Sequence, residues 1–198
     1  MSIKRNFFKN QRVAISVDVQ NLFYSAKCQF HGKVDFEKLM YRCTLGRQLV
    51  RATAYVVETS EINQKSFFEK LSKYGYYIKT KSLKVRADGS SKGDWDMGIA
   101  IDAISLADKV DAFVLISGDG DYVDLINLLK SRGVFVEVHS FPKSTSDGLI
   151  RACNKYYPLD ESVIYLDPKN RNADNSDVTV SPPVTPAQVP SREVPLQT

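Results

Sequence analysis

The sequence predicts an α/β fold, a three-layer α/β/α sandwich around a mainly parallel sheet. Short β-branched apolar runs recur along the chain, and patterns typical of helices separate them. The runs are continuous rather than alternating, as expected for strands that are buried on both faces. Strands separated by helices require right-handed crossovers, which cover a parallel sheet with helices. Ligands of such folds bind beyond the carboxyl ends of the strands.

The first half of the chain alternates two strands with two helices. The apolar runs 13–17 and 53–57 predict the strands. Residues 35–49 predict a helix because their apolar side chains recur at helical spacing. Residues 61–74 predict a second helix, which ends at Gly75.

The second half continues the alternation around the most hydrophobic strand of the chain. The long helix expected before that strand is largely apolar, which indicates burial against the sheet. In chain order, the expected elements are one or two short strands in 76–86, a turn at 87–91, a helix at 94–109, a strand at 112–116, a helix at 122–131 ended by Gly133, a strand at 134–138 and a helix at 146–155.

The length of 198 residues allows one compact domain with extensions. A hydrophobic content of 43% and a charged content of 25% exclude a wholly disordered chain. Residues 168–198 include no aromatic residue and no glycine but six prolines, so this stretch buries too little apolar area to fold. We therefore expect an N-terminal extension at 1–10, a domain at 11–167 and a disordered, proline-rich tail at 168–198.

Charge and cysteine usage favour a cytoplasmic protein with an anionic partner. The net charge is +4 and its excess lies before the tail, which fits nucleic acid. The chain has neither an apolar run of about 18 residues nor a secretory signal, so no membrane partner is expected. Cys28, Cys43 and Cys153 form neither a disulfide framework nor a CxxC pair, and His31 and His139 are interpreted as structural or surface residues.

Four aspartates lie where expected strands and helices meet at one edge of the sheet. Asp18 follows the first strand, Asp119 and Asp121 follow the strand 112–116, and Asp96 lies in the first turn of the helix between them. Like charges that converge raise one another's pKa, and a divalent cation removes this repulsion. Oxygen ligands without nearby cysteine or histidine favour Mg²⁺ or Mn²⁺ over zinc.

Local structural roles remain alternatives for these acids. Asp121 is a candidate N-cap of the helix that follows it, and Asp94 or Asp96 is a candidate N-cap of the preceding helix. Asp119 is a candidate turn residue between two glycines. Asp18 fits such a role less well, because it is a charge directly after a buried strand.

Three motifs carry a family resemblance. DVQN at 18–21, KGDWDMGIAID at 92–102 and SGDGDY at 117–122 resemble the signatures of NYN domains. These domains belong to the PIN-like nucleases, and the motifs are similar to those of the LabA-like (DUF88) branch. The resemblance covers about residues 10–160, with the motifs in the expected order.

The resemblance implies a PIN-like, Rossmann-like sandwich with a metal-dependent ribonuclease centre. The implied catalytic residues and metal ligands are Asp18, Asp96, Asp119 and Asp121, and the implied polar positions for a ligand or a substrate phosphate are Asn21 and Ser117. The segment from Ser146 onward resembles a further family segment, but Asn154 stands where related sequences often carry an acid. An acidic role at that position is therefore not expected.

A basic run leads to the acidic centre. Its members are Lys79, Lys81, Lys84, Arg86 and Lys92, of which Lys81, Lys84 and Lys92 are the candidate contacts to substrate phosphates. Three tyrosines before the run, Tyr74, Tyr76 and Tyr77, offer stacking surfaces for unpaired bases, so the expected partner is single-stranded RNA. Phe23 or Tyr24 is a further candidate near the groove, with a core position as the alternative. The alternative is that the lysines protect a strand edge. Asp102 lies about 120° around its helix from Asp96, which favours a supporting position behind the ligands or pairing with a basic group over direct metal contact.

The function that best fits the residues and the resemblance is a divalent-metal-dependent endoribonuclease. The alternative is a regulatory RNA-binding or scaffold protein with this fold and little catalytic activity. Other phosphate-processing folds fit less well: Gln20 stands where a haloacid-dehalogenase-type phosphatase needs a second aspartate, and no GxxxxGK[ST] loop is present. The sequence leaves homo-oligomerisation open.

Overall fold

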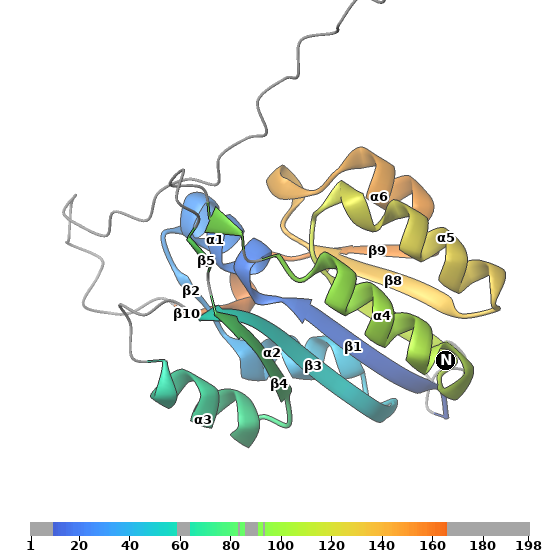
Figure 1. The fold of residues 1–198 in the computed structure, drawn as a ribbon, viewed down its shortest axis with the longest axis horizontal. Helices are drawn as coiled ribbons and strands as arrows, with labels where there is room; N and C mark the ends of the chain where they lie inside the picture. The colour runs from blue at the N-terminus through green and yellow to red at the C-terminus, as the bar shows by residue number, and fades with distance from the viewer. Residues whose placement is uncertain (1–9, 59–63, 83, 86–90, 93, 166–198) are drawn as a thin grey trace, which may run out of the picture.

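A computed structural model describes residues 10–58, 64–82, 84–85, 91–92 and 94–165. Six parallel strands form one sheet in the order β4-β3-β1-β7-β8-β9 (Figure 1). The strands are β1 (Arg12–Asp18), β3 (Gln48–Glu58), β4 (Tyr77–Ser82), β7 (Ala112–Ile116), β8 (Phe135–Ser140) and β9 (Lys155–Pro158). The predicted three-layer α/β fold is confirmed.

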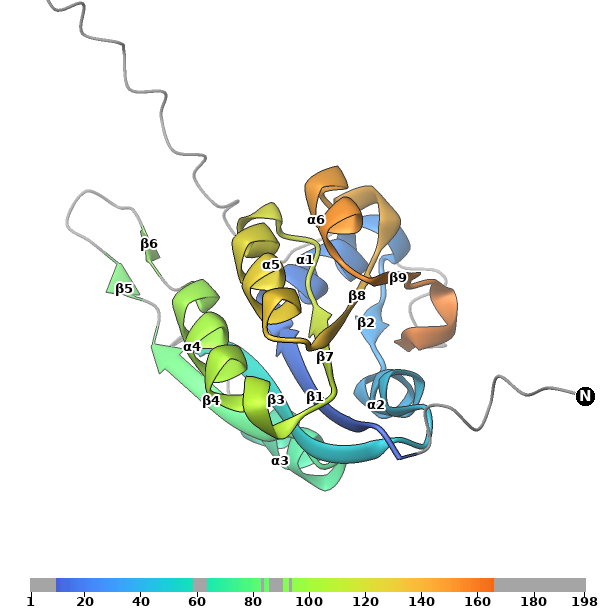
Figure 2. The ribbon, with the colours of Figure 1, turned by 90° about the vertical axis from the view of Figure 1, so that its right-hand side faces the viewer.

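Helices cover both faces of this sheet (Figure 2). One face packs against α1 (Val19–Phe30), α2 (Phe36–Thr44) and α3 (Lys65–Lys73). The other packs against α4 (Asp96–Leu106), α5 (Val123–Ser131) and α6 (Asp147–Ala152).

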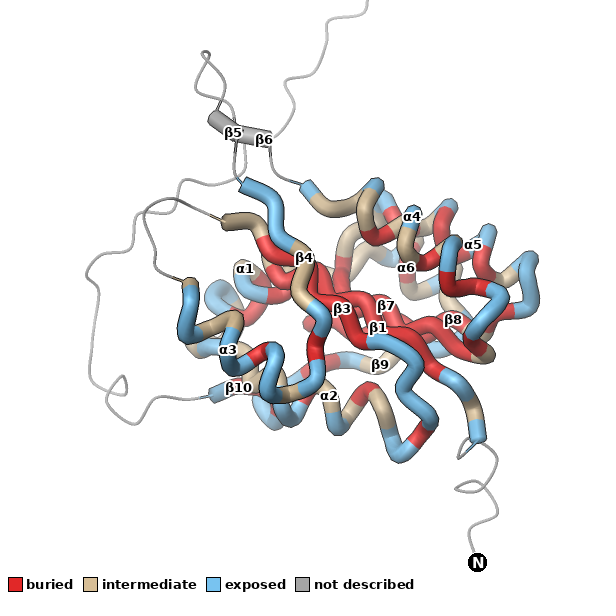
Figure 3. The backbone as a smooth tube through the Cα atoms, turned by 60° about the horizontal axis from the view of Figure 1, so that its bottom comes forward, coloured by how far each residue is buried: buried red, intermediate tan, exposed pale blue. Residues whose placement is uncertain are grey.

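Alternation along the central strands divides the core in two. Val13, Ile15 and Val17 of β1 contribute to the core under α1 to α3, whereas Ala14 contributes to the core under α4 to α6. All of these residues are buried because the strands are covered on both sides, as the burial colours of the central sheet show (Figure 3). The continuous apolar runs of the sequence are therefore explained by this double coverage.

Small elements complete the described part of the chain. The short strands are β2 (Lys33–Val34), which pairs with β10 (Ile164–Tyr165), and β5 (Lys84–Val85), which pairs with β6 (Ser91–Lys92). The 3-10 turns are η2 (Ala107–Lys109), η3 (Gly120–Tyr122), η4 (Pro142–Ser144) and η5 (Glu161–Val163). Among the described helices, none has the length and apolar character that a bilayer crossing requires.

The strand order reverses between β1 and β7. From β1 the chain proceeds outward through β3 to β4, then returns along α4 to β7 and proceeds outward on the other side. Such a reversal is the topological switch point, where the carboxyl ends of two neighbouring strands diverge and a ligand can approach. Asp18 ends β1 and Ser117 follows β7, so the first and third sequence motifs meet at this point.

Several predicted boundaries were wrong. The helix expected at 35–49 ends at Thr44, because Leu45 and Gly46 adopt left-handed backbone conformations and β3 begins at Gln48. The helix expected at 146–155 ends at Ala152, and Lys155 already belongs to the unexpected strand β9. The helix expected at 94–109 continues as a 3-10 turn after Leu106.

Other expectations have different outcomes. The strands expected at 13–17 and 112–116 are confirmed, and the strand expected at 53–57 extends to the whole of β3. The three cysteines are free thiols, as expected from their spacing. The turn expected at 87–91 and the tail expected at 168–198 lie largely or wholly outside the described residues.

Candidate metal centre

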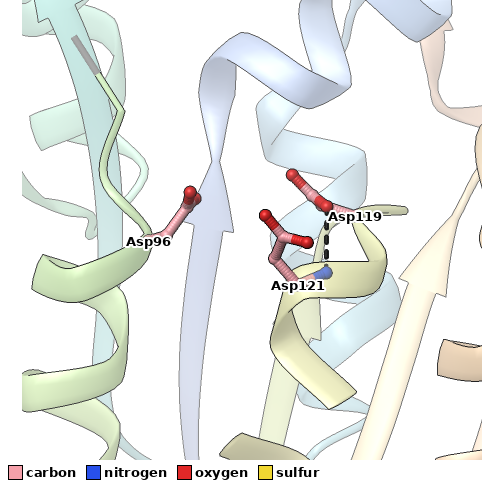
Figure 4. Close-up of side chains that lie close together, drawn as sticks. All are labelled: Asp96, Asp119 and Asp121. Atoms are coloured by element: carbon pink, nitrogen blue, oxygen red, sulfur yellow. Dashed lines mark hydrogen bonds between the residues drawn. The ribbon is translucent and has the colours of Figure 1, made fainter. Parts of the chain in front are cut away.

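Three of the four predicted aspartates converge at the switch point. Asp96 begins α4, and Asp119 and Asp121 belong to the loop and 3-10 turn after β7. One carboxylate oxygen from each residue lies within 4.8 Å of the other two (Figure 4). Two elements that are far apart in the sequence therefore aim three carboxylates at one small volume.

Asp18 lies beside this group and is more buried than any of its three aspartates. Its side chain accepts a hydrogen bond from the Asn21 backbone N–H at 3.0 Å, so Asp18 is the N-cap of α1. Asp18 therefore has the local structural role that its place after a buried strand made least expected. Burial raises the pKa of Asp18 to about 6, and the charges of Asp96 and Asp119 add to this effect.

The Tyr122 hydroxyl links the two acids that come from different elements. It donates to Asp96 Oδ1 at 2.9 Å and lies 3.4 Å from Asp18 Oδ2. Burial and the adjacent acids raise the pKa of Tyr122 far above its ordinary value, so its proton remains available for donation. Sequence reasoning missed this residue, although its place directly after two acids at a strand end was a usable signal.

The capping alternatives for Asp94, Asp96 and Asp121 were wrong. The N-cap of α4 is Trp95 and that of α5 is Tyr122, and neither helix has a side-chain cap. Asp119 does have the expected turn role, because its Oδ1 accepts the Asp121 backbone N–H at 3.0 Å. The Asp96 and Asp121 carboxylates are therefore not used to begin these helices.

The two predicted polar positions shape the loop that carries Asp119. Ser117 is fully buried, and its hydroxyl accepts the Asp119 backbone N–H at 3.2 Å. The Asn21 side-chain oxygen accepts the Gly118 N–H at 3.0 Å. A Cβ at Gly118 would lie 2.1 Å from the Ser144 carbonyl oxygen, so only glycine fits here. Contact of Asn21 or Ser117 with a substrate stays a prediction.

The donor set of the centre fits a hard divalent cation. Its three converging ligands are carboxylates, and oxygen ligands are those that Mg²⁺ and Mn²⁺ prefer. Burial raises the pKa of Asp96, and the charges of Asp119, Asp94 and Asp121 raise it further against the hydrogen bond from Tyr122. This mutual repulsion is what a bound cation would relieve.

The basic run divides into residues with different surroundings. Lys79 forms a salt bridge with Asp102 at 2.6 Å, and the Tyr55 hydroxyl donates to the same carboxylate at 2.7 Å. The expected pairing of Asp102 with a basic group is confirmed. Lys81 donates to the Asp94 carbonyl at 3.0 Å. The side chains of Lys84, Arg86 and Lys92 lie outside the described part of the structure.

Replacing Asp18 with asparagine is expected to stabilise the metal-free protein at pH 7.5 by up to about 3 kcal/mol, at about 1.4 kcal/mol per pKa unit. Because its folded-state pKa is about 6, the native state holds a proton that the unfolded chain releases between about pH 4 and 6. The contribution of Asp18 to the stability of the parent protein therefore falls as the pH rises through that range. Asparagine retains an N-cap acceptor and has no charge.

Urea unfolding in chelator at pH 5 and pH 7.5 measures this effect. The difference in free energy of unfolding between Asp18→Asn and the parent protein should be smaller at pH 5, where the Asp18 carboxyl of the parent protein is mostly protonated. If the two proteins differ in free energy of unfolding by the same amount at both pH values, the folded-state pKa of Asp18 is not raised.

Comparison with known proteins supports the reading of the motifs. The model of the NYN domain family matches residues 12–160. The chain is 28% identical over 173 residues to the low amplitude and bright protein LabA of Synechococcus elongatus, covering 83% of this chain and 92% of that protein. A crystal structure of a protein of unknown function from Vibrio parahaemolyticus superposes with a TM-score of 0.74 at 34% identity, covering 79% of this chain and 98% of that chain. The chain belongs to the NYN domain family.

Proposed function

We propose that this protein is a divalent-metal-dependent ribonuclease that hydrolyses RNA phosphodiester bonds. The observation that supports this most strongly is the convergence of Asp96, Asp119 and Asp121 at the switch point of an NYN domain. NYN domains are generally nucleases of the PIN-like group. A cluster of carboxylates at this place has a clear chemical use in phosphoryl chemistry, because it holds cations against an anionic substrate.

The four acids have two roles in this proposal. Asp96, Asp119 and Asp121 would hold Mg²⁺ or Mn²⁺, and Asp18 would complete the anionic site from its buried position behind them. The ion supplies an activated water and neutralises charge on the phosphate and leaving oxygen. Tyr122 keeps Asp96 and Asp18 in place through its hydroxyl. No protein nucleophile is required.

The expected substrate is single-stranded RNA. Phe23 lies in the second turn of α1, whose N-cap is Asp18, and the residue is 45% exposed. An exposed aromatic ring near a strand end offers a stacking surface for an unpaired base, and stacking is independent of base identity. We propose that Lys81, Lys84 and Lys92 contact phosphates. Lys84 and Lys92 are paired in the β5–β6 register, so their backbones lie opposite each other.

Incubation with end-labelled RNA tests the function. The full chain should cleave single-stranded RNA with Mg²⁺ or Mn²⁺, should cleave duplex RNA more slowly, and should be inactive in chelator. RNA binding without cleavage under all of these conditions would instead support the regulatory or scaffold alternative. If the protein neither binds nor cleaves RNA, both functions are contradicted.

Replacing Lys84 and Lys92 with alanine should weaken RNA binding alike for all sequences. Each phosphate contact contributes about −0.7 to the slope of log affinity against log salt for a single strand. Two lost contacts should make the slope shallower by up to about 1.4. Fluorescence anisotropy with a short RNA at several salt concentrations measures this slope.

The matched control replaces Lys109 and Arg132 with alanine and removes the same charge. Both residues are exposed and lie before β7 and β8, at the amino ends of these strands and away from the acidic site. This control should leave the slope unchanged. If the lysines only protect a strand edge, their replacement will leave the slope unchanged and increase light scattering from aggregates.

A further inference from the structure

The start of α4 carries Asp96 and lacks the usual means of fixing a helix end. Its N-cap is Trp95, whose side chain makes no capping hydrogen bond. The first backbone N–H groups of a helix need partners, and a side-chain cap normally fixes the geometry there. The position of Asp96 must therefore be set by other contacts of the segment 94–96.

The Trp95 side chain provides the first of these contacts. Its indole Nε1–H donates to the Val56 carbonyl of β3 at 3.0 Å. Its ring packs edge-on against Tyr55, with 5.3 Å between the ring centroids. Tyr55 is itself buried in the core and hydrogen-bonded to Asp102 of α4. Trp95 thus fastens the start of α4 to the central sheet.

Lys81 of the neighbouring strand β4 closes over the other side of the segment. Its ammonium group lies 4.2 Å from the centroid of the Trp95 ring and donates to the Asp94 carbonyl at 3.0 Å. A cation over an indole face is an attractive arrangement. One side chain therefore holds both residues that precede Asp96.

Gly98 leaves the space that the indole ring occupies. A Cβ at this position would lie 2.5 Å from Cε3 and 2.9 Å from Cζ3 of Trp95. Any larger residue would therefore displace the ring. Glycine has low helix propensity, so its presence in the first turn of α4 is explained by the packing of the ring against the helix.

We infer that Trp95 is a positioning residue for the metal centre, and that Lys81 and Gly98 lock it so that the Asp96 carboxylate faces Asp119 and Asp121. This inference rests on the proposed function. It also gives Lys81 a role before any RNA is bound, because its contacts lie within the protein. A side chain that only contacts phosphate would not influence the affinity of the free protein for a divalent ion.

Calorimetric titration of the full chain with Mn²⁺, without RNA, tests the inference. Residues that orient a ligand typically contribute about 10- to 100-fold to metal affinity. We expect Lys81→Ala to weaken Mn²⁺ binding at least about tenfold, and Lys81→Arg to recover most of the loss because a guanidinium also donates and stacks on indole. Lys109→Ala removes the same charge from the 3-10 turn η2, which follows the far end of α4, and should bind Mn²⁺ like the parent protein.

Gly98→Ala is the second variant. It leaves Lys81 in place and raises helix propensity, so weaker binding in this variant cannot come from a weakened helix. We expect its Mn²⁺ affinity to fall as in Lys81→Ala. Circular dichroism verifies that each variant is folded.

Trp95 is the only tryptophan of the chain, so intrinsic fluorescence reports on this segment directly. Without any metal, Lys81→Ala should make Trp95 more accessible to quenching by acrylamide, whereas Lys109→Ala should not. Addition of Mg²⁺ to the parent protein should change the emission, and Asp119→Asn should abolish this response.

The outcomes separate the inference from the proposed function. If the parent protein binds Mn²⁺ and both Lys81→Ala and Gly98→Ala bind it equally well, the positioning role is overturned and the metal centre stands. If the parent protein binds no divalent ion, the proposed function fails and the inference fails with it. Loss of affinity in both variants with recovery in Lys81→Arg supports the inference.

Discussion

Replacing Asp119 with asparagine is expected to abolish metal-dependent RNA cleavage and to leave the fold intact. The change removes a charge from the group formed with Asp96 and Asp121 but retains a side-chain oxygen that accepts the Asp121 N–H. Since loss of a residue that merely orients a ligand costs about 10- to 100-fold, loss of a ligand should reduce cleavage at least about 100-fold. Single-turnover assays with labelled RNA in Mg²⁺ measure the loss.

Stability of the same variant provides the control. In chelator, Asp119→Asn should unfold at the same urea concentration as the parent protein or at a higher one, because repulsion of Asp96 is relieved. Asp124→Asn is a matched variant, since Asp124 is an exposed residue of α5 outside the converging carboxylates. Unfolding of Asp119→Asn, or cleavage at the rate of Asp124→Asn, would show that Asp119 is a turn residue only.

The central strands of the sheet were predictable because they are buried on both faces. The run 112–116 is apolar at every position, and each of its residues is buried in the structure. Helix ends were less predictable, because they depend on single backbone conformations such as the left-handed Leu45. The strand β9 was missed because it lies at the edge of the sheet and is only partly buried. Its residues are therefore polar and aromatic and form no continuous apolar run.

The acids of the site were predictable, but the contacts that position them were not. Asp18, Asp96, Asp119 and Asp121 follow or precede recognisable elements, and topology brings these ends together. By contrast, the contact of Lys81 with Trp95 joins β4 to the start of α4 across an intervening hairpin. Local patterns contain no information about which side chains meet at such a distance.

Loss of the buried ion pair between Arg47 and Glu137, which lies away from the metal centre, has the largest expected effect on stability. Arg47 donates to both carboxylate oxygens of Glu137 in β8, at 2.8 and 2.9 Å. Both side chains are almost completely buried, at 1% and 3% exposure. Burial alone raises the pKa of Glu137, but the nearby His139 ring, whose Nε2 lies 3.6 Å from Glu137 Oε2, and the two hydrogen bonds from Arg47 outweigh burial and lower it. Glu137 therefore stabilises the fold above its unfolded-state pKa, and this contribution is lost as the pH falls through its lower folded-state value.

Glu137→Ala is expected to destabilise the protein by about 3–5 kcal/mol, because the Arg47 guanidinium would remain buried without its counter-ion. This loss is a large part of the roughly 5–15 kcal/mol by which a domain is stable. Urea unfolding at pH 7.5 measures the difference, and the metal centre should keep its Mn²⁺ affinity in the folded fraction.

Replacing both partners distinguishes the cost of an unpaired charge from the value of the pair. In Arg47→Met with Glu137→Leu, no charge is left buried, and apolar side chains of similar length fill the space between α2 and β8. The double variant should recover most of the stability lost in Glu137→Ala, since well-packed apolar replacements of buried ion pairs are often neutral or stabilising. Arg47 also donates to the carbonyls of Cys43 and Thr44, at 2.6 and 3.1 Å, which methionine cannot do. A double variant as unstable as Glu137→Ala would therefore show that Arg47 stabilises the end of α2 rather than neutralising Glu137.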